Sequence, residues 1–160
     1  MGRVTAVDEP DLAILLAAAY RALTERLEDA MEARRIEGMR PSFGFVIRAV
    51  DAEQPTITRL AEMLDVTKQS ASALADEAER AGFVERVIAP SDRRSRCLRL
   101  TAKGRKVRAT ALAASDKLER ELEQTLGAGG LAAMRAGLLE VVARSGALDD
   151  VLARRARLVW

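Results

Sequence analysis

Apolar residues recur at helical spacing near both ends of this 160-residue chain, and shorter patterned segments fill the middle. The first pattern predicts a helix over residues 10–37, which Gly38 ends. The last pattern predicts a long helix over residues 101–126, a glycine-rich break at 127–130 and further helix from Leu131. The fold class is therefore expected to be mostly α.

The middle of the chain predicts three short helices. One spans residues 41–50, a second is capped by Thr56, and a third is capped by Thr67 and spans residues 68–81. The last two are joined by a turn at Asp65. Two capped helices at this spacing are typical of a helix-turn-helix. Small residues on the inner face of the third let the helices cross closely: Ala71, Ala75 and Ala78.

A β-hairpin is predicted directly after the helix-turn-helix, from the β-prone runs 83–88 and 96–100. Its turn is built on Pro90, Ser91 and Asp92. Three arginines follow the turn: Arg93, Arg94 and Arg96. Arginine is rarely buried without a partner, so these side chains are expected to face a polyanion. A hairpin in this place is the wing of a winged helix.

Charge and composition narrow the function. The net charge is only +2, but residues 93–108 hold eight basic residues and no acidic one, which favours a polyanionic partner over a merely solvated surface. The chain has no histidine, which excludes Ser-His-Asp and Cys-His catalysis and His-ligated zinc. We therefore expect no enzyme, no catalytic residue, no metal site and no cofactor.

The cellular location follows from the cysteine count and from hydropathy. Cys97 is the single cysteine, so an intramolecular disulfide is excluded and a reducing cytoplasm is expected. We find no apolar stretch of membrane-spanning length and expect no membrane partner. Alternation along the strand puts Cys97 on the outer face with Arg99, where it is either a small apolar residue or a redox sensor.

Four segments together resemble the MarR family of bacterial transcription regulators, and the resemblance extends over residues 11–142. The segments 60–70, 82–86, 92–96 and 98–104 read LAEMLDVTKQS, GFVER, DRRSR and LRLTAKG. The resemblance implies an obligate homodimer on a pseudo-palindromic operator, usually a repressor that a small molecule releases. The chain departs from the family at Asp65, where glycine is usual, and at Ala73 and Glu77, where basic residues are common.

The residues expected to contact DNA lie on two elements. The start of the 68–81 helix would enter the major groove, with Gln69 bonding an adenine edge and Lys68 reaching guanine or phosphate. The full set there is Thr67, Lys68, Gln69, Ser70 and Ser72. On the wing, Arg94 would enter a narrow minor groove, and Arg93 and Arg96 would hold phosphates.

The long terminal helices predict the assembly. They cannot all bury their apolar stripes on so small a middle domain, so a two-fold dimer is favoured over a monomeric helical bundle. We expect an N-terminal dimerisation helix at 1–38, a winged helix-turn-helix DNA-binding domain at 39–104, and C-terminal dimerisation helices at 105–160.

An effector cleft is expected between the dimerisation helices and the DNA-binding domain. Its bulky candidates, which ordinary core packing would also explain, are Tyr20, Met39, Arg40, Phe43 and Phe45. The resemblance suggests an aromatic carboxylate or phenolic ligand. The function is thus expected to be sequence-specific binding of double-stranded DNA. The alternative is a helical protein-interaction adaptor with an idle or non-specific wing.

Overall fold

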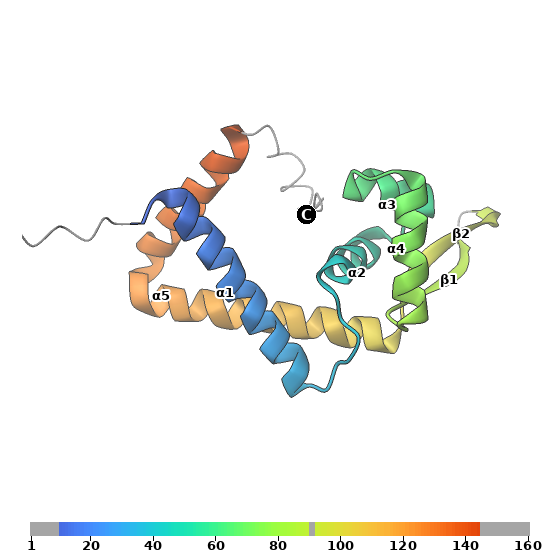
Figure 1. Ribbon diagram of the computed structural model, residues 1–160, viewed down its shortest axis with the longest axis horizontal. Coiled ribbons are helices and arrows are strands. Elements are labelled where there is room, and N and C mark those ends of the chain that lie inside the picture. Colours follow the sequence, from blue (N-terminus) through green and yellow to red (C-terminus); the bar gives the residue numbers. More distant parts are fainter. Residues whose placement is uncertain (1–9, 90–91, 145–160) are drawn as a thin grey trace, which may run out of the picture.

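The computed structural model describes residues 10–89 and 92–144, without the side chains of residues 89 and 92–94. Its order is four helices, a two-stranded hairpin and one long helix, as the patterns predicted (Figure 1). The elements are α1 (Leu12–Ala33), α2 (Pro41–Glu53), α3 (Ile57–Leu64), α4 (Lys68–Arg80), β1 (Val84–Ala89), β2 (Asp92–Leu100) and α5 (Ala102–Arg144).

The first helix ends earlier than predicted. Asp11 caps its start by accepting a hydrogen bond from the Ile14 N–H at 2.9 Å. The helix stops at Ala33 rather than near residue 37, because Arg35 takes a left-handed φ of 53° and turns the chain. That turn buries Ile36 in the core. A tertiary contact therefore overrides the local helical pattern.

The helix-turn-helix forms as its caps predicted. Thr56 accepts from the Arg59 N–H at 3.3 Å, and Thr67 accepts from the Ser70 N–H at 3.1 Å. Asp65 ends α3 with a φ of 53°, the left-handed conformation that glycine would adopt most easily. Helix α2 continues to Glu53, three residues past the predicted end at 50.

The hairpin is antiparallel, with Val84 opposite Leu100 and a bulge between Ile88 and Ala89. The second strand begins at Asp92, so Asp92, Arg93 and Arg94 belong to β2 rather than to the turn or to the residues just after it. The predicted turn residues Pro90 and Ser91 lie outside the described residues.

Cys97 is buried although its neighbour on the same strand face is exposed. Alternation puts it on the face of Arg99, opposite Leu98 and Leu100, and Cys97 is 3% exposed there. The Leu98 N–H donates to the Pro55 carbonyl at 2.9 Å and holds the chain between α2 and α3 along β2 at this point. Cys97 and Leu98 point to opposite faces and both are buried, so both faces are covered at this point of β2, and Cys97 behaves as a small apolar residue.

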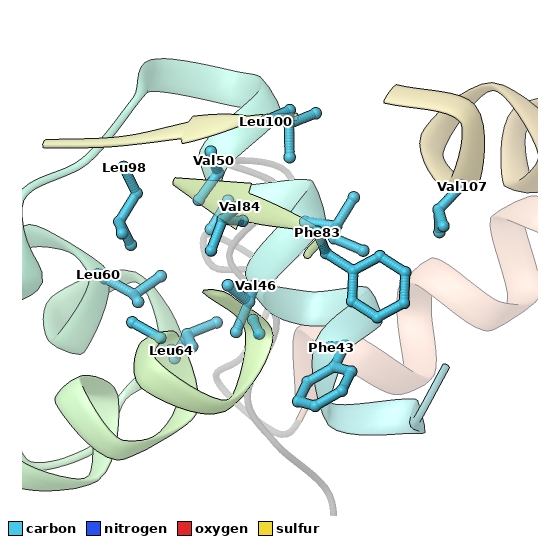
Figure 2. Packing of buried hydrophobic residues seen from close by; sticks show 14 of the residues in the cluster. Phe43, Val46, Val50, Leu60, Leu64, Phe83, Val84, Leu98, Leu100 and Val107 are labelled. Carbon is cyan, nitrogen blue, oxygen red and sulfur yellow. The ribbon is translucent and has the colours of Figure 1, made fainter. Parts of the chain in front are cut away.

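The core lies inside the helix-turn-helix and hairpin module. The Phe43 and Phe83 rings meet with centroids 5.6 Å apart, and Val107 of α5 joins them (Figure 2). Gly104 allows this close approach, because a Cβ there would lie 2.0 Å from the Phe83 carbonyl oxygen. The first turns of α5 are thus fixed on the module.

The rest of α5 has a different environment. Within the described part of α5, no residue after Thr110 is buried, and Gly127 breaks the helix with a φ of 72°. In Figure 1, α1 crosses α5 on the side away from α4 and the hairpin. By length and composition alone, α5 is apolar enough to cross a membrane, with mean hydropathy 1.4 over 18 residues and none of them buried. This differs from the expectation that no such stretch exists.

Candidate nucleic-acid interface

The N-terminal end of α4 presents polar side chains to solvent. Thr67, Lys68, Gln69 and Ser70 are exposed there, and Ser72 is half-buried. The Thr67 and Ser70 hydroxyl oxygens lie 2.9 Å apart and both take part in the helix cap. Within the described residues, no hydrogen bond engages the Lys68 or Gln69 side chain. These two side chains are available for a ligand at the end of α4.

The acidic half of α4 is neutralised inside the chain. Arg86 of β1 pairs with Asp76 at 2.5 Å and also with Glu79, while Arg40 pairs with Glu77 at 3.1 Å. Partial burial lowers the pKa of Arg86, but the hydrogen bond to Asp76 and the nearby carboxylates outweigh it and raise that pKa above its usual value. The acidic side chains therefore face internal arginines. The sequence analysis did not identify Arg86 as the partner of these carboxylates, although its positive charge and its position shortly after α4 made it a candidate.

The hairpin exposes one arginine near its tip, Arg96, whose side chain the structure describes. Arg96 is exposed and stands opposite Ile88, which is itself 63% exposed, near the tip of the hairpin. Arg93 and Arg94 belong to β2 on the tip side of Arg96, and their side chains lie outside the described part of the chain. Arg99, nearer the base, pairs with Glu85 at 3.1 Å. Free positive charge on the described hairpin is thus concentrated toward its tip.

Most of the basic run from 93 to 108 has internal partners. Lys103 donates to the Ala81 carbonyl at 2.9 Å and lies 4.3 Å from the Phe83 ring centroid. Five of its eight basic residues are engaged in this way: Arg99, Lys103, Arg105, Lys106 and Arg108. These contacts fix α5 and the hairpin rather than leaving charge for a polyanion. Fewer basic side chains are therefore available to a polyanion than the charge run suggested.

A cleft of about 650 Å³ lies between the end of α1 and the start of α2. Of the five predicted effector residues, Met39 and Arg40 line it. Phe43 is buried in the core, Phe45 packs against the core, and Tyr20 is 62% exposed on α1. The other lining residues were not predicted from the sequence, although helical spacing along α1 places several of them on one face: Leu27, Glu28 and Met31.

The described residues hold no group of three or more histidine, cysteine, aspartate or glutamate side chains arranged to bind a metal ion. The exposed polar groups at the start of α4 and on the hairpin are helix-end donors, an amide and a guanidinium group, all of which can donate hydrogen bonds to phosphates or bases.

Comparison with known proteins gives a family match over the module. Residues 44–95, from α2 into β2, match the family model described as the MarR family. No curated protein matches the chain.

Solved structures resemble most of the chain. The S. aureus MepR–DNA complex aligns with a TM-score of 0.64 at 20% identity, covering 82% of this chain and 98% of that one. The reduced form of MarR from E. coli aligns with a TM-score of 0.61 at 21% identity, covering 84% and 98%. At such identities the likeness shows a shared fold. Residues 44–95, which hold the helix-turn-helix and the first part of the wing, thus match the MarR family of winged helix-turn-helix, DNA-binding transcription regulators, on a fold that the rest of the described chain shares with those structures.

Proposed function

We propose that this protein is a sequence-specific, homodimeric repressor that a small molecule releases from a pseudo-palindromic operator in the cytoplasm. The observation that carries the proposal is the exposed start of α4, where Lys68 and Gln69 have no hydrogen-bond partner among the described residues. It lies on the same module as an arginine-bearing hairpin. A similar fold in the S. aureus MepR structure was crystallised with DNA, which supports a nucleic-acid partner for this surface.

Base reading is assigned to α4. Its N-terminal end enters the major groove, Gln69 bonds an adenine edge and Lys68 contacts guanine or phosphate. Thr67 and Ser70 hold the helix cap and use their remaining capacity for phosphate, and Ser72 is a lesser contact. The internal pairing of the α4 carboxylates supports this, because it removes repulsion from the phosphate backbone.

Shape reading is assigned to the wing. Arg94 enters a narrow minor groove, and Arg93 and Arg96 bind flanking phosphates. The exposure of Arg96 near the hairpin tip supports this division.

The dimer is formed by α1 and by α5 beyond residue 110. These segments expose large apolar side chains that the chain itself leaves uncovered: Leu12, Ile14, Leu15, Tyr20, Leu23, Leu112, Leu126, Met134, Leu138 and Val141. Burying them between two copies stabilises the pair by about 25 cal/mol per Å² of apolar surface removed from water. We retain the division into 1–38, 39–104 and 105–160 as dimerisation, DNA-binding and dimerisation segments.

The effector site is the cleft between α1 and α2. It lies where a dimerisation helix meets the DNA-binding module, so an occupant changes the distance between paired α4 helices. Met39 and Arg40 remain assigned to it, whereas the positions of Tyr20, Phe43 and Phe45 favour ordinary surface and core roles. An aromatic carboxylate or phenol is the proposed ligand class, on the family resemblance.

The direct test is capture of fragmented genomic DNA by the purified protein, followed by sequencing and mobility shifts at two salt concentrations. We expect one enriched pseudo-palindrome whose binding weakens as salt rises. Equal binding to all fragments, or none, would favour the adaptor and overturn the proposal.

A further inference from the structure

Two basic side chains at the start of α5 bind helices of the helix-turn-helix and hairpin module. The Nζ atom of Lys103 donates a hydrogen bond to the carbonyl of Ala81, the residue that ends α4, at 2.9 Å. The guanidinium of Arg108 pairs with the Asp51 carboxylate of α2 at 2.8 Å. The helix α5 is thus joined by side chains both to the recognition helix and to α2.

Both basic side chains are partly withdrawn from solvent. Lys103 is half-buried, and its ammonium nitrogen lies 4.3 Å from the Phe83 ring centroid. The aromatic ring and the carbonyl end of α4 both favour a positive charge there. The Arg108 side chain is only 17% exposed. Side chains that are engaged inside the chain in this way are little available to phosphate, so their role differs from that of the wing arginines.

Two attachments fix the direction of a helix, whereas one attachment leaves it free to pivot. Lys103 and Arg108 lie about 7.5 Å apart along the axis of α5. Between them, Gly104 and Val107 are buried against the module. The close contact at Gly104 and Val107 holds α5 on the module, and the polar contact on either side of it resists tilting.

A small tilt at the start of α5 becomes a large displacement farther along it. Residues 102–126 form a helix about 37 Å long before Gly127 breaks it. A tilt of about 5° at the start moves the far end of this helix by about 3 Å, close to the rise of one base pair, about 3.4 Å. In a dimer held together by α5, the angle between α5 and the module therefore controls the distance between the two α4 helices on the scale of one base pair.

We propose that Lys103 and Arg108 are positioning residues that set the angle between α5 and the module, and that they thereby select the half-site spacing of the operator. Asp51, the partner of Arg108, shares this role. The inference rests on the dimeric, operator-binding function proposed above and names the residues that give it spacing specificity. Without either contact, α5 pivots on the module and the dimer accepts half-sites that lie one base pair closer together or farther apart.

Operators of altered spacing test the inference on the full-length protein. Mobility shifts would use the captured operator with its half-sites moved one base pair closer together or farther apart. The preference for the native spacing should fall roughly 2- to 5-fold in Arg108→Gln, Asp51→Asn and Lys103→Met, the range that one partly exposed polar contact supports. The control is Arg105→Gln, which removes the same charge from the same helix but only a bond to the Leu100 carbonyl at the end of β2. It should keep the wild-type preference.

The two partners of the ion pair separate positioning from a phosphate contact. Arg108→Gln removes a positive charge and Asp51→Asn removes a negative one, so a role in binding phosphate gives them opposite effects on affinity at every spacing. A positioning role gives both variants the same loss of spacing preference. Asp51→Asn, at an exposed residue, also decides the test if Arg108→Gln does not fold. Opposite changes in affinity with an unchanged spacing preference, or a wild-type preference in both variants, would overturn the inference.

A distance within one chain tests the angle without DNA. Nitroxide labels would be placed at two exposed positions, Ala73→Cys on α4 and Ser115→Cys on α5, in a Cys97→Ala background diluted with unlabelled chains. Double electron–electron resonance should give a broader distance distribution in Arg108→Gln and the wild-type distribution in Arg105→Gln, with thermal melting to verify that both are folded.

The two measurements distinguish failure of this inference from failure of the proposed function. An unchanged distance distribution in Arg108→Gln overturns the inference and leaves operator binding by the wild-type protein standing. A wild-type protein that captures no paired half-sites overturns the proposed function, and the selection of spacing with it.

Discussion

The module built from α2, α3, α4 and the hairpin differs sharply from the two arms, α1 and α5 beyond residue 110. The module buries nearly all of the core, including Val46, Leu60 and Phe83 at 0% exposure. The arms bury one residue among those described, Met31, and present apolar side chains to solvent. The module is therefore stabilised by its own core, whereas the described part of the arms leaves apolar surface exposed to solvent. The contrast separates substitutions that affect folding from those that affect assembly.

The largest expected effect is on folding of the module. Leu60→Ala should lower the free energy of unfolding by about 2–5 kcal/mol, because it leaves a cavity in a close-packed core. Leu138→Ala, on the exposed face of α5, should instead raise the dimer dissociation constant. Denaturant unfolding would measure the first and light scattering over a dilution series the second. If Leu138→Ala lowered the free energy of unfolding as strongly as Leu60→Ala, the contrast would be wrong.

The next largest effect on stability is expected from substitution of two glycines in α5. Gly104→Ala places a Cβ against the Phe83 carbonyl and should cost about 1–3 kcal/mol of unfolding free energy. Gly129→Ala meets nothing within 4 Å in the chain and should be neutral or stabilise α5 by up to about 1 kcal/mol. Thermal melting of both variants checks this. A well-tolerated Gly104→Ala would contradict the close seating of α5 on the module.

Substitutions in the two elements proposed to contact DNA, the hairpin and α4, should have different effects on operator binding. Arg94→Ala should weaken operator binding by roughly 1–3 kcal/mol, most strongly on sites with A·T-rich flanks. Gln69→Ala should relax base preference at one symmetric pair of operator positions. Binding to a randomised operator library would measure both. Uniform loss across all sequences for both variants would refute the division into shape and base readers.

The smallest effect on stability is expected from the ion pair between the arms. Arg26 of α1 donates a hydrogen bond to Glu121 of α5 at 2.6 Å. That hydrogen bond lowers the pKa of Glu121 below its ordinary value of 4.5, although desolvation opposes it. The folded chain thus holds fewer protons at this carboxyl than the unfolded chain. The contribution to stability is present above the ordinary pKa and is lost as pH falls through the lowered one. Melting temperatures of wild type and Glu121→Gln should differ slightly near neutral pH and converge in acid; a constant difference would show that the tie is not ionic.

Local signals in the sequence were sufficient for the helix caps and breaks. Thr56 and Thr67 cap their helices by hydrogen bonds within three residues, and Gly127 breaks α5 where the glycine-rich run predicted. These features depend on neighbours along the chain. The sequence therefore specified the helix-turn-helix, the wing and the long last helix.

The features that the sequence did not predict depend on contacts between segments far apart in the chain. Burial of Ile36 ended α1 early, and the Leu98 N–H of β2 bonds to the Pro55 carbonyl between α2 and α3. Lys106 and Arg108 looked free in a basic run but bond to the Arg34 carbonyl and to Asp51, more than 50 residues away. Periodicity and charge counts do not contain such pairings. Phe43, one of the residues predicted for the effector cleft, packs on Phe83 from the hairpin for the same reason.

The central claim is that two modules, held by the arms, read one operator together. Footprinting of the protein on its captured genomic fragment tests it most directly. The account predicts two symmetric protected half-sites whose centres lie about one helical turn, roughly 34 Å, apart, with both lost together on dilution of the protein. A single protected half-site that persists at monomer concentrations would contradict it.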